Sequence, residues 1–157
     1  MPSDFKIRVA EPNIEEEDAK AVYKAVKEEC LSGSGPYNKQ FEKNFLKLNK
    51  FKYGIAVGSG TDALIIALKA LGIGNNCNDE VITVSNTAIP TVSAIKSAGA
   101  KVVFVDIGND YLMNANKIEQ HITKNTKAIM PVHLYGQACD MKKICQIAKK
   151  NNLKIIE

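Results

Sequence analysis

The residues with the clearest capacity for chemistry lie in the segment GSGTDAL, residues 58–64. This segment follows a short apolar run and leads into an amphipathic stretch, the order of a strand, a turn and a helix. Backbone N–H groups in the first turn of a helix have no partner within the helix and lie at its positive end, so a phosphate is a suitable ligand there. A tight turn that binds nothing also needs glycine. The sequence leaves the phosphate site and the plain turn as equal interpretations.

The same segment fits the dinucleotide fingerprint G-x-G-x-x-A through Gly58, Gly60 and Ala63. A dinucleotide-binding domain also needs an acidic residue at the end of its second strand, where the carboxylate holds the ribose. Here Asp79 and Glu80 stand at the start of that strand. A nicotinamide-dependent oxidoreductase is therefore disfavoured.

Two further polar segments follow predicted strands. The first is SNTAIPT, residues 85–91, in which Asn86 and Thr87 are candidates either to reach a ligand or to cap the next helix. The second is VHLYGQACDM, residues 132–141, which carries His133. Because neither a nucleophile nor an orienting acid accompanies this histidine, hydrolase chemistry is not indicated. A zinc site on His133, Cys139 and Cys145 would match no common ligand spacing.

The elements that must position these residues alternate along the chain. Apolar runs and amphipathic stretches follow one another from residue 53 onward, which predicts an α/β domain with a parallel sheet and helices on its faces. The predicted strands are 53–57, 80–85, 101–105, 127–132 and 153–157, and the predicted helices are 61–72, 88–99, 114–123 and 140–151, the last two capped by Asn114 and Asp140.

Two helices are predicted before this region. Residues 13–31 have helical spacing, with Asn13 as the cap and Glu16 three positions on. A second helix carries Phe41, Phe45 and Leu48 on one face, which predicts core packing. We expect residues 1–50 to be a helical segment and residues 51–157 the sheet region, both belonging to one domain.

Composition and charge exclude several classes. The 157 residues are 45% hydrophobic with a net charge of +4, and their lysines are scattered along the chain. A nucleic-acid-binding protein normally concentrates basic charge and uses arginine, whereas Arg8 is the only arginine here. No apolar run is long enough to span a membrane, and residues 1–20 are too polar for a signal peptide, so a cytoplasmic location is expected.

Three segments, taken in order and spacing, resemble the DegT/DnrJ/EryC1/StrS family of pyridoxal-phosphate (PLP) aminotransferases, which act on nucleotide-linked keto sugars. They are FEKNFLKLNKFKYGIAVGSGTDALIIALKALGIG, DEVITVSNTAIPTVSAIKSAGAKVVFVDI and VHLYGQACDM. The likeness runs from about Asn13 to Glu157. It implies the large domain of the aspartate-aminotransferase-like (type I) fold, a homodimer, and a loop at 31–37 that faces the subunit interface.

The resemblance also implies which residues contact the cofactor. Ser59, Gly60 and Thr61 would lie at its phosphate, with the backbone N–H groups of Gly60 and Thr61 as donors. The segment after the second strand would cover the pyridine ring, and Asn86 is the nearest polar candidate there. Family members usually carry a stacking aromatic side chain where this sequence has Ala88.

The family's other functional residues have no match within this sequence. In the family, the strand corresponding to LKIIE is followed by an aspartate for the pyridine nitrogen, and the Schiff-base lysine comes some tens of residues later. Both would lie beyond Glu157, so no catalytic residue and no metal ligand are assigned here. We expect a chain that stops inside the fifth strand, leaves the 53–57 strand without neighbours, is marginally stable and does not transaminate alone.

The leading hypothesis is therefore the N-terminal portion of an aminotransferase that moves an amino group from glutamate to a nucleotide-linked keto-6-deoxyhexose. The SNTAI stretch favours a 3-keto over a 4-keto acceptor. The alternatives are a catalytically inactive binding or regulatory protein and, less favoured, the nicotinamide-dependent oxidoreductase.

Overall fold

The computed structural model describes residues 11–157, in two units that meet between Ala56 and Val57. Arg8 lies outside the described residues. Each unit has its own secondary structure, so each is described by itself.

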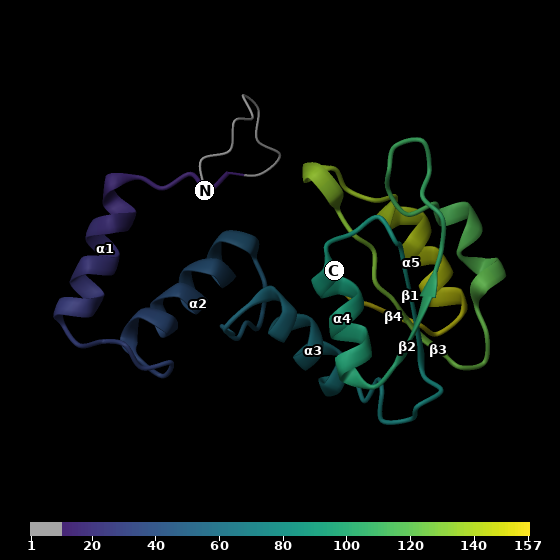
Figure 1. Cartoon of the computed structure of the whole chain (residues 1–157), viewed down its shortest axis with the longest axis horizontal. Coiled ribbons are helices and arrows are strands. Elements are labelled where there is room, and N and C mark those ends of the chain that lie inside the picture. The colour runs from purple at the N-terminus through teal and green to yellow at the C-terminus, as the bar shows by residue number, and fades with distance from the viewer. Residues whose placement is uncertain (1–10) are drawn as a thin grey trace. The chain divides into compact units, whose positions relative to one another are not determined.

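The unit from Val57 to Glu157 is built on a four-stranded parallel sheet (Figure 1). Its strands lie in the order β2-β1-β3-β4, and they are β1 (Glu80–Thr83), β2 (Lys101–Phe104), β3 (Thr126–Ile129) and β4 (Lys154–Ile155). All four fall within predicted strands or begin one residue before them. The prediction of a parallel α/β sheet is confirmed.

Helices cover both faces of this sheet, as Figure 1 shows. On one side lie α3 (Gly60–Ala70) and α4 (Ile89–Ala98), and on the other lies α5 (Met141–Lys150). Alternate strand residues point to opposite faces, so Val81 packs with the first helix pair and Ile82 with α5. Two apolar cores result, one on each side of the sheet.

One prediction for this unit needs correction. The predicted helix at 114–123 is instead two 3₁₀ turns, η1 (Ala115–Lys117) and η2 (Glu119–His121). After η2 the chain turns toward β3, and in this turn the Thr123 hydroxyl donates to the Glu80 carboxylate at 2.5 Å. The caps at Asn114 and Asp140 are confirmed, with Asn114 accepting from the Asn116 N–H and Asp140 from the Lys143 N–H, each at 3.1 Å.

The other unit contains α1 (Glu16–Lys27) and α2 (Pro36–Asn49). Helix α1 begins later than predicted: Glu15 rather than Asn13 is the N-cap residue, and its N–H donates to the Asp18 carboxylate at 2.9 Å. The prediction of core packing for α2 is wrong. Phe41, Phe45 and Leu48 are all exposed, because among residues 11–56 no second apolar layer covers them.

The predicted strand at 53–57 does not form. An extended segment becomes a strand only when a neighbour pairs its backbone groups. Within the described residues no strand lies beside it, and the Ala56 N–H donates instead to the Glu42 carboxylate at 2.8 Å. Tyr53 and Ile55 remain 79% and 84% exposed, so the segment lacks the neighbours that a strand needs.

Candidate functional site

The start of α3 is a capped helix end. Ser59 has an extended backbone, and its Oγ accepts the Asp62 N–H at 3.1 Å. The Ser59 hydroxyl in turn donates to the Asp62 carboxylate at 2.8 Å. The side chain of Ser59 is therefore committed to capping.

The backbone N–H groups of the two residues after Ser59 make no hydrogen bond within the described part of the chain. Among residues 11–157, no acceptor takes the N–H of Gly60 or of Thr61. A Cβ built on Gly60 would meet no atom within 4 Å, so a ligand can approach the backbone closely there. Together with the positive end of an 11-residue helix, these donors can bind an anion such as a phosphate group.

A cavity of about 180 Å³ lies where the strands end, and we name it the edge cavity. Its lining comes from four elements: Leu64 of α3, Thr91 of α4, residues 130–133 after β3 and Glu157 after β4. Leu64 stands one helical turn beyond Thr61, which puts the helix start beside the carboxyl ends of the strands. Ligands of parallel α/β proteins bind at this edge.

The segment after β1 contributes less directly. Asn86 is half-buried, and its amide donates to the Tyr111 carbonyl oxygen at 3.2 Å. Thr87 and Thr91 share a hydroxyl hydrogen bond of 2.7 Å. Ala88 is exposed and is the N-cap residue of α4.

The predicted site residues lie on the segments that border the edge cavity, but none of them lines it. Ser59, Gly60, Thr61, Asn86 and Ala88 are absent from that lining. Sequence reasoning missed Leu64 and Thr91. Their signal is spacing, since each lies three or four residues after a predicted site residue on the same helix face.

His133 also lines the edge cavity, although it was not among the predicted site residues. Its Nε2 lies 2.8 Å from a carboxylate oxygen of Glu157, and its Nδ1 accepts the Cys139 N–H at 3.1 Å. Tyr135, in the η3 turn (Leu134–Gly136), has a left-handed φ of 55° and is 74% exposed.

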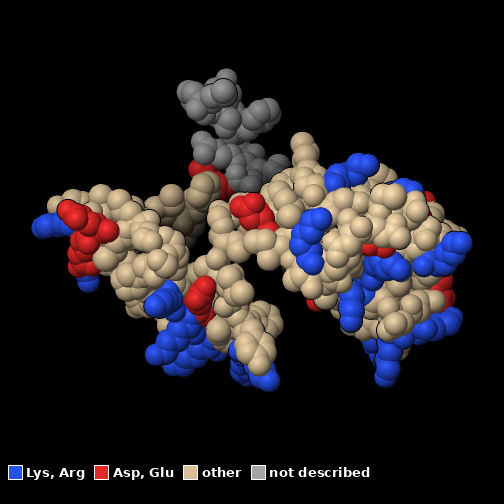
Figure 2. Space-filling view, turned by 90° about the horizontal axis from the view of Figure 1, so that it is seen from below, with Lys and Arg blue, Asp and Glu red and all other residues tan. Residues whose placement is uncertain are grey.

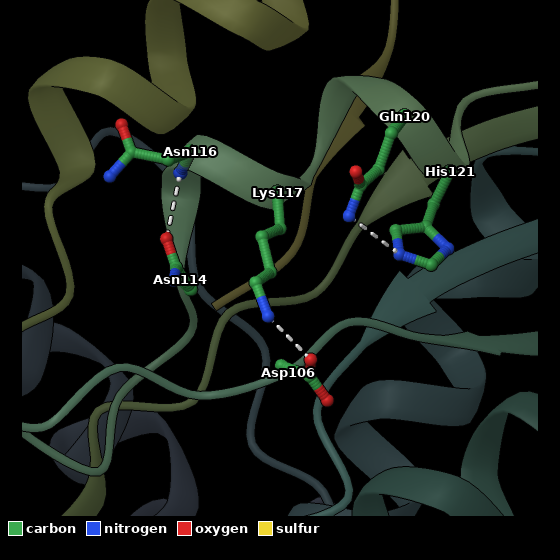
Figure 3. Close-up of polar contacts among 6 residues, drawn as sticks. All are labelled: Asp106, Asn114, Asn116, Lys117, Gln120 and His121. Atoms are coloured by element: carbon green, nitrogen blue, oxygen red, sulfur yellow. Dashed lines mark hydrogen bonds and ion pairs between the residues drawn. The ribbon is translucent and has the colours of Figure 1, made fainter.

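Beyond β2, ion pairs fix the 106–121 segment. Asp106 accepts a hydrogen bond from Lys117 at 2.6 Å, and Figure 3 shows the two side chains pointing toward one another. That hydrogen bond, with the lysine's positive charge, lowers the pKa of Asp106. Glu119 has the same relation to Lys150 of α5, at 2.7 Å, and its pKa is lowered for the same reasons.

These lowered pKa values predict acid sensitivity. A carboxyl group whose pKa is depressed by folding stabilises the fold above its unfolded pKa of about 4, and that contribution is lost as pH falls through the folded value. We expect the urea concentration at the midpoint of unfolding to decrease when the pH is lowered below about 4. Because both groups are solvent-exposed, the effect is small. Asp106→Asn and Lys117→Met should flatten the profile equally, and variants whose profiles run parallel to the wild type would contradict this assignment.

Other kinds of site find no support in the described part of the chain. No helix between residues 11 and 157 has the length and apolar character needed to cross a membrane. Across the same residues no three His, Cys, Asp or Glu side chains cluster as metal ligands. On the face drawn in Figure 2, basic side chains are scattered in separate groups, with fewer acidic ones between them.

Comparison with known proteins decides the family. The model of the DegT/DnrJ/EryC1/StrS aminotransferase family matches residues 12–157. The chain belongs to this family. A family relative, GDP-perosamine synthase from Escherichia coli O157:H7, is 43% identical over 152 residues, covering 96% of this chain and 41% of the relative.

Further members of the family agree. The dTDP-3-amino-3,6-dideoxy-alpha-D-galactopyranose transaminase of Aneurinibacillus thermoaerophilus is 50% identical over 118 residues, which are 74% of this chain and 32% of that protein. The crystal structure of NtdA from Bacillus subtilis with bound cofactor PMP superposes with a TM-score of 0.84 at 40% identity. It covers 92% of this chain and 34% of NtdA. The chain therefore spans well under half the length of these family members.

Proposed function

We propose that this chain is the N-terminal part of the large domain of a PLP-dependent aminotransferase, and that it binds the cofactor phosphate. In the whole enzyme the amino group would pass from glutamate to a nucleotide-linked keto-6-deoxyhexose. When bound, the cofactor supplies a ring that withdraws electrons from the carbon that gains or loses the amino group. Residues 11–56 and the sheet unit would belong to that one domain.

The observation that carries the proposal is the open start of α3. The N–H groups of Gly60 and Thr61 have no acceptor among residues 11–157, and Gly60 leaves room for a ligand. Two donors at a positive helix end suit a phosphate, and the edge cavity beside them gives the rest of the molecule a place to lie. The residues present therefore fit the phosphate of PLP.

The other cofactor residues have more limited roles in this proposal. Ser59 caps α3 and so orients the two donors, because its hydroxyl is already bonded to Asp62. Asn86, held by the Tyr111 carbonyl, would present its remaining amide oxygen near the ring. Ala88 would let the ring lie close to the start of α4 without stacking on an aromatic side chain.

One relative bears on the acceptor of the whole enzyme. A relative whose name specifies a dTDP-linked 3-amino-3,6-dideoxy sugar supports a 3-keto, 6-deoxy acceptor. We propose a cytoplasmic homodimer, with the 31–37 loop at its interface. The Schiff-base lysine and the pyridine-binding aspartate are proposed to lie outside residues 1–157, so this chain alone would not transaminate.

A ligand comparison tests the proposal. We expect PLP to bind the chain at least tenfold more tightly than pyridoxal, which lacks the phosphate, because each hydrogen bond to a charged group contributes about 1.5–3 kcal/mol. The measurement is fluorescence titration with PLP, pyridoxal and NADH. Equal affinity for PLP and pyridoxal would refute the phosphate site, and preference for NADH would favour the oxidoreductase alternative.

A further inference from the structure

His133 has both ring nitrogens in use. The Cys139 N–H donates to Nδ1 at 3.1 Å, so Nδ1 is an acceptor and carries no proton. The proton of the neutral ring then lies on Nε2, which donates to the Glu157 carboxylate at 2.8 Å. Cys139 is buried, with an exposed fraction of 5%. Its N–H is therefore a fixed donor that anchors the His133 ring.

The hydrogen bond to Glu157 joins the ends of two neighbouring strands. Only two pairs of residues define the β3–β4 ladder, Ala128 with Lys154 and Ile129 with Ile155. One more backbone bond, from the Ile156 N–H to the Ile129 carbonyl oxygen at 3.1 Å, extends the pairing. The His133–Glu157 bond comes next along the strands, so it is a side-chain tie where the ladder ends.

This tie also closes one wall of the edge cavity. His133 and Glu157 both line that cavity, together with Leu64 and Thr91 from the two helices. If the end of β4 moved away from β3, the wall would open and the cavity would lose its shape. The carboxylate of Glu157 would then also be free to turn toward a ligand.

We propose that His133 is a positioning residue, which holds the end of β4 against β3 through Glu157 and so shapes the edge cavity for the cofactor ring. The part concerning the ring rests on the proposed function. The part concerning β4 does not, because it follows from the hydrogen bonds alone.

Two substitutions distinguish the two hydrogen bonds that the His133 side chain makes, one with Cys139 and one with Glu157. In His133→Gln the amide nitrogen can take the place of Nε2 and donate to Glu157, while the acceptor for Cys139 is lost. In His133→Asn the amide oxygen can take the place of Nδ1, while the donor to Glu157 is lost. The matched control is His121→Asn, since His121 lies on η2 and contacts Gln120 (Figure 3).

Hydrogen exchange of the Ile156 N–H measures whether β4 stays paired. We expect His133→Asn to speed that exchange about tenfold, and His133→Gln and His121→Asn to leave it near the wild-type rate. PLP affinity should follow the same order, with about tenfold weaker binding for His133→Asn only. Far-ultraviolet circular dichroism checks that every variant is folded.

The outcomes distinguish the two proposals. If His133→Gln, rather than His133→Asn, speeds Ile156 exchange and weakens PLP binding, then the hydrogen bond from Cys139 is the one that matters. That result would overturn the inference. Unchanged Ile156 exchange in His133→Asn would overturn it as well. Exchange that responds while the chain binds PLP with unchanged affinity would overturn the part concerning the cofactor ring. If the wild-type chain fails to bind PLP but exchange follows the expected order, the proposed function fails and the role of His133 in holding β4 stands.

Discussion

Gly60→Pro is expected to weaken PLP binding by about tenfold or more while leaving the helix intact. Proline has no N–H, so the substitution removes one of the two uncommitted donors, and a hydrogen bond to a charged group contributes about 1.5–3 kcal/mol. The first helical position tolerates proline, whose fixed φ suits a helix start. The preceding residue must be extended, and Ser59 already is, with φ −158° and ψ 165°.

Gly60→Ala is the matched control for this experiment. It keeps the N–H and adds a Cβ that would meet no atom within 4 Å. We expect it to bind PLP more tightly than the proline variant does, because it retains the N–H that proline removes. Fluorescence titration gives both affinities. A proline variant that binds PLP as tightly as the alanine variant would show that the backbone of α3 does not hold the phosphate.

Ile129→Ala is expected to destabilise the sheet unit by about 2–5 kcal/mol, the usual cost of emptying a fully buried isoleucine site. Ile129 has no exposed surface and lies on β3, between β1 and β4. It packs against Ile144 and Ile147 of α5 in the core on that side of the sheet. Since whole domains are stable by only about 5–15 kcal/mol, this one substitution removes a large part of the total.

Urea unfolding followed by circular dichroism measures that loss. Ile66→Ala removes the same atoms from a residue of α3 that is 51% exposed, and alanine favours helix, so its stability should change by less than about 1 kcal/mol. Equal losses for the two variants would mean that β3 is not the buried centre of this unit.

The sheet could be predicted from the sequence because its signals are local and repeated. Short apolar runs separated by polar or glycine-containing turns, such as the Ser85–Asn86–Thr87 turn before α4 and the Gly99 turn after it, identify buried parallel strands. The 53–57 run has the same composition and yet forms no strand among the described residues. An apolar composition indicates only that a segment tends to be buried. A strand also needs a neighbouring strand to pair with, and no local pattern shows where that neighbour is.

In the candidate site, too, local features could be predicted from the sequence and contacts between distant residues could not. The family resemblance implied the N–H groups of Gly60 and Thr61 as donors, and both lack an acceptor among residues 11–157. The predicted helix at 114–123 is two 3₁₀ turns, and this segment bonds to residues far away in the chain, Glu119 to Lys150 and Thr123 to Glu80, which no local pattern reveals. The His133–Glu157 contact was beyond prediction for the same reason: its partners lie 24 residues apart and meet only once the strands pair.

The most direct test of the central claim is a two-dimensional ¹⁵N–¹H NMR titration of the chain with PLP and with inorganic phosphate. If the start of α3 binds the cofactor phosphate, the amide signals of Gly60 and Thr61 will be among those that shift most with either ligand. Signals near the edge cavity, such as those of Leu64 and His133, will shift with PLP only. If PLP binds while the Gly60 and Thr61 signals stay in place, the claim that this helix start holds the phosphate is wrong.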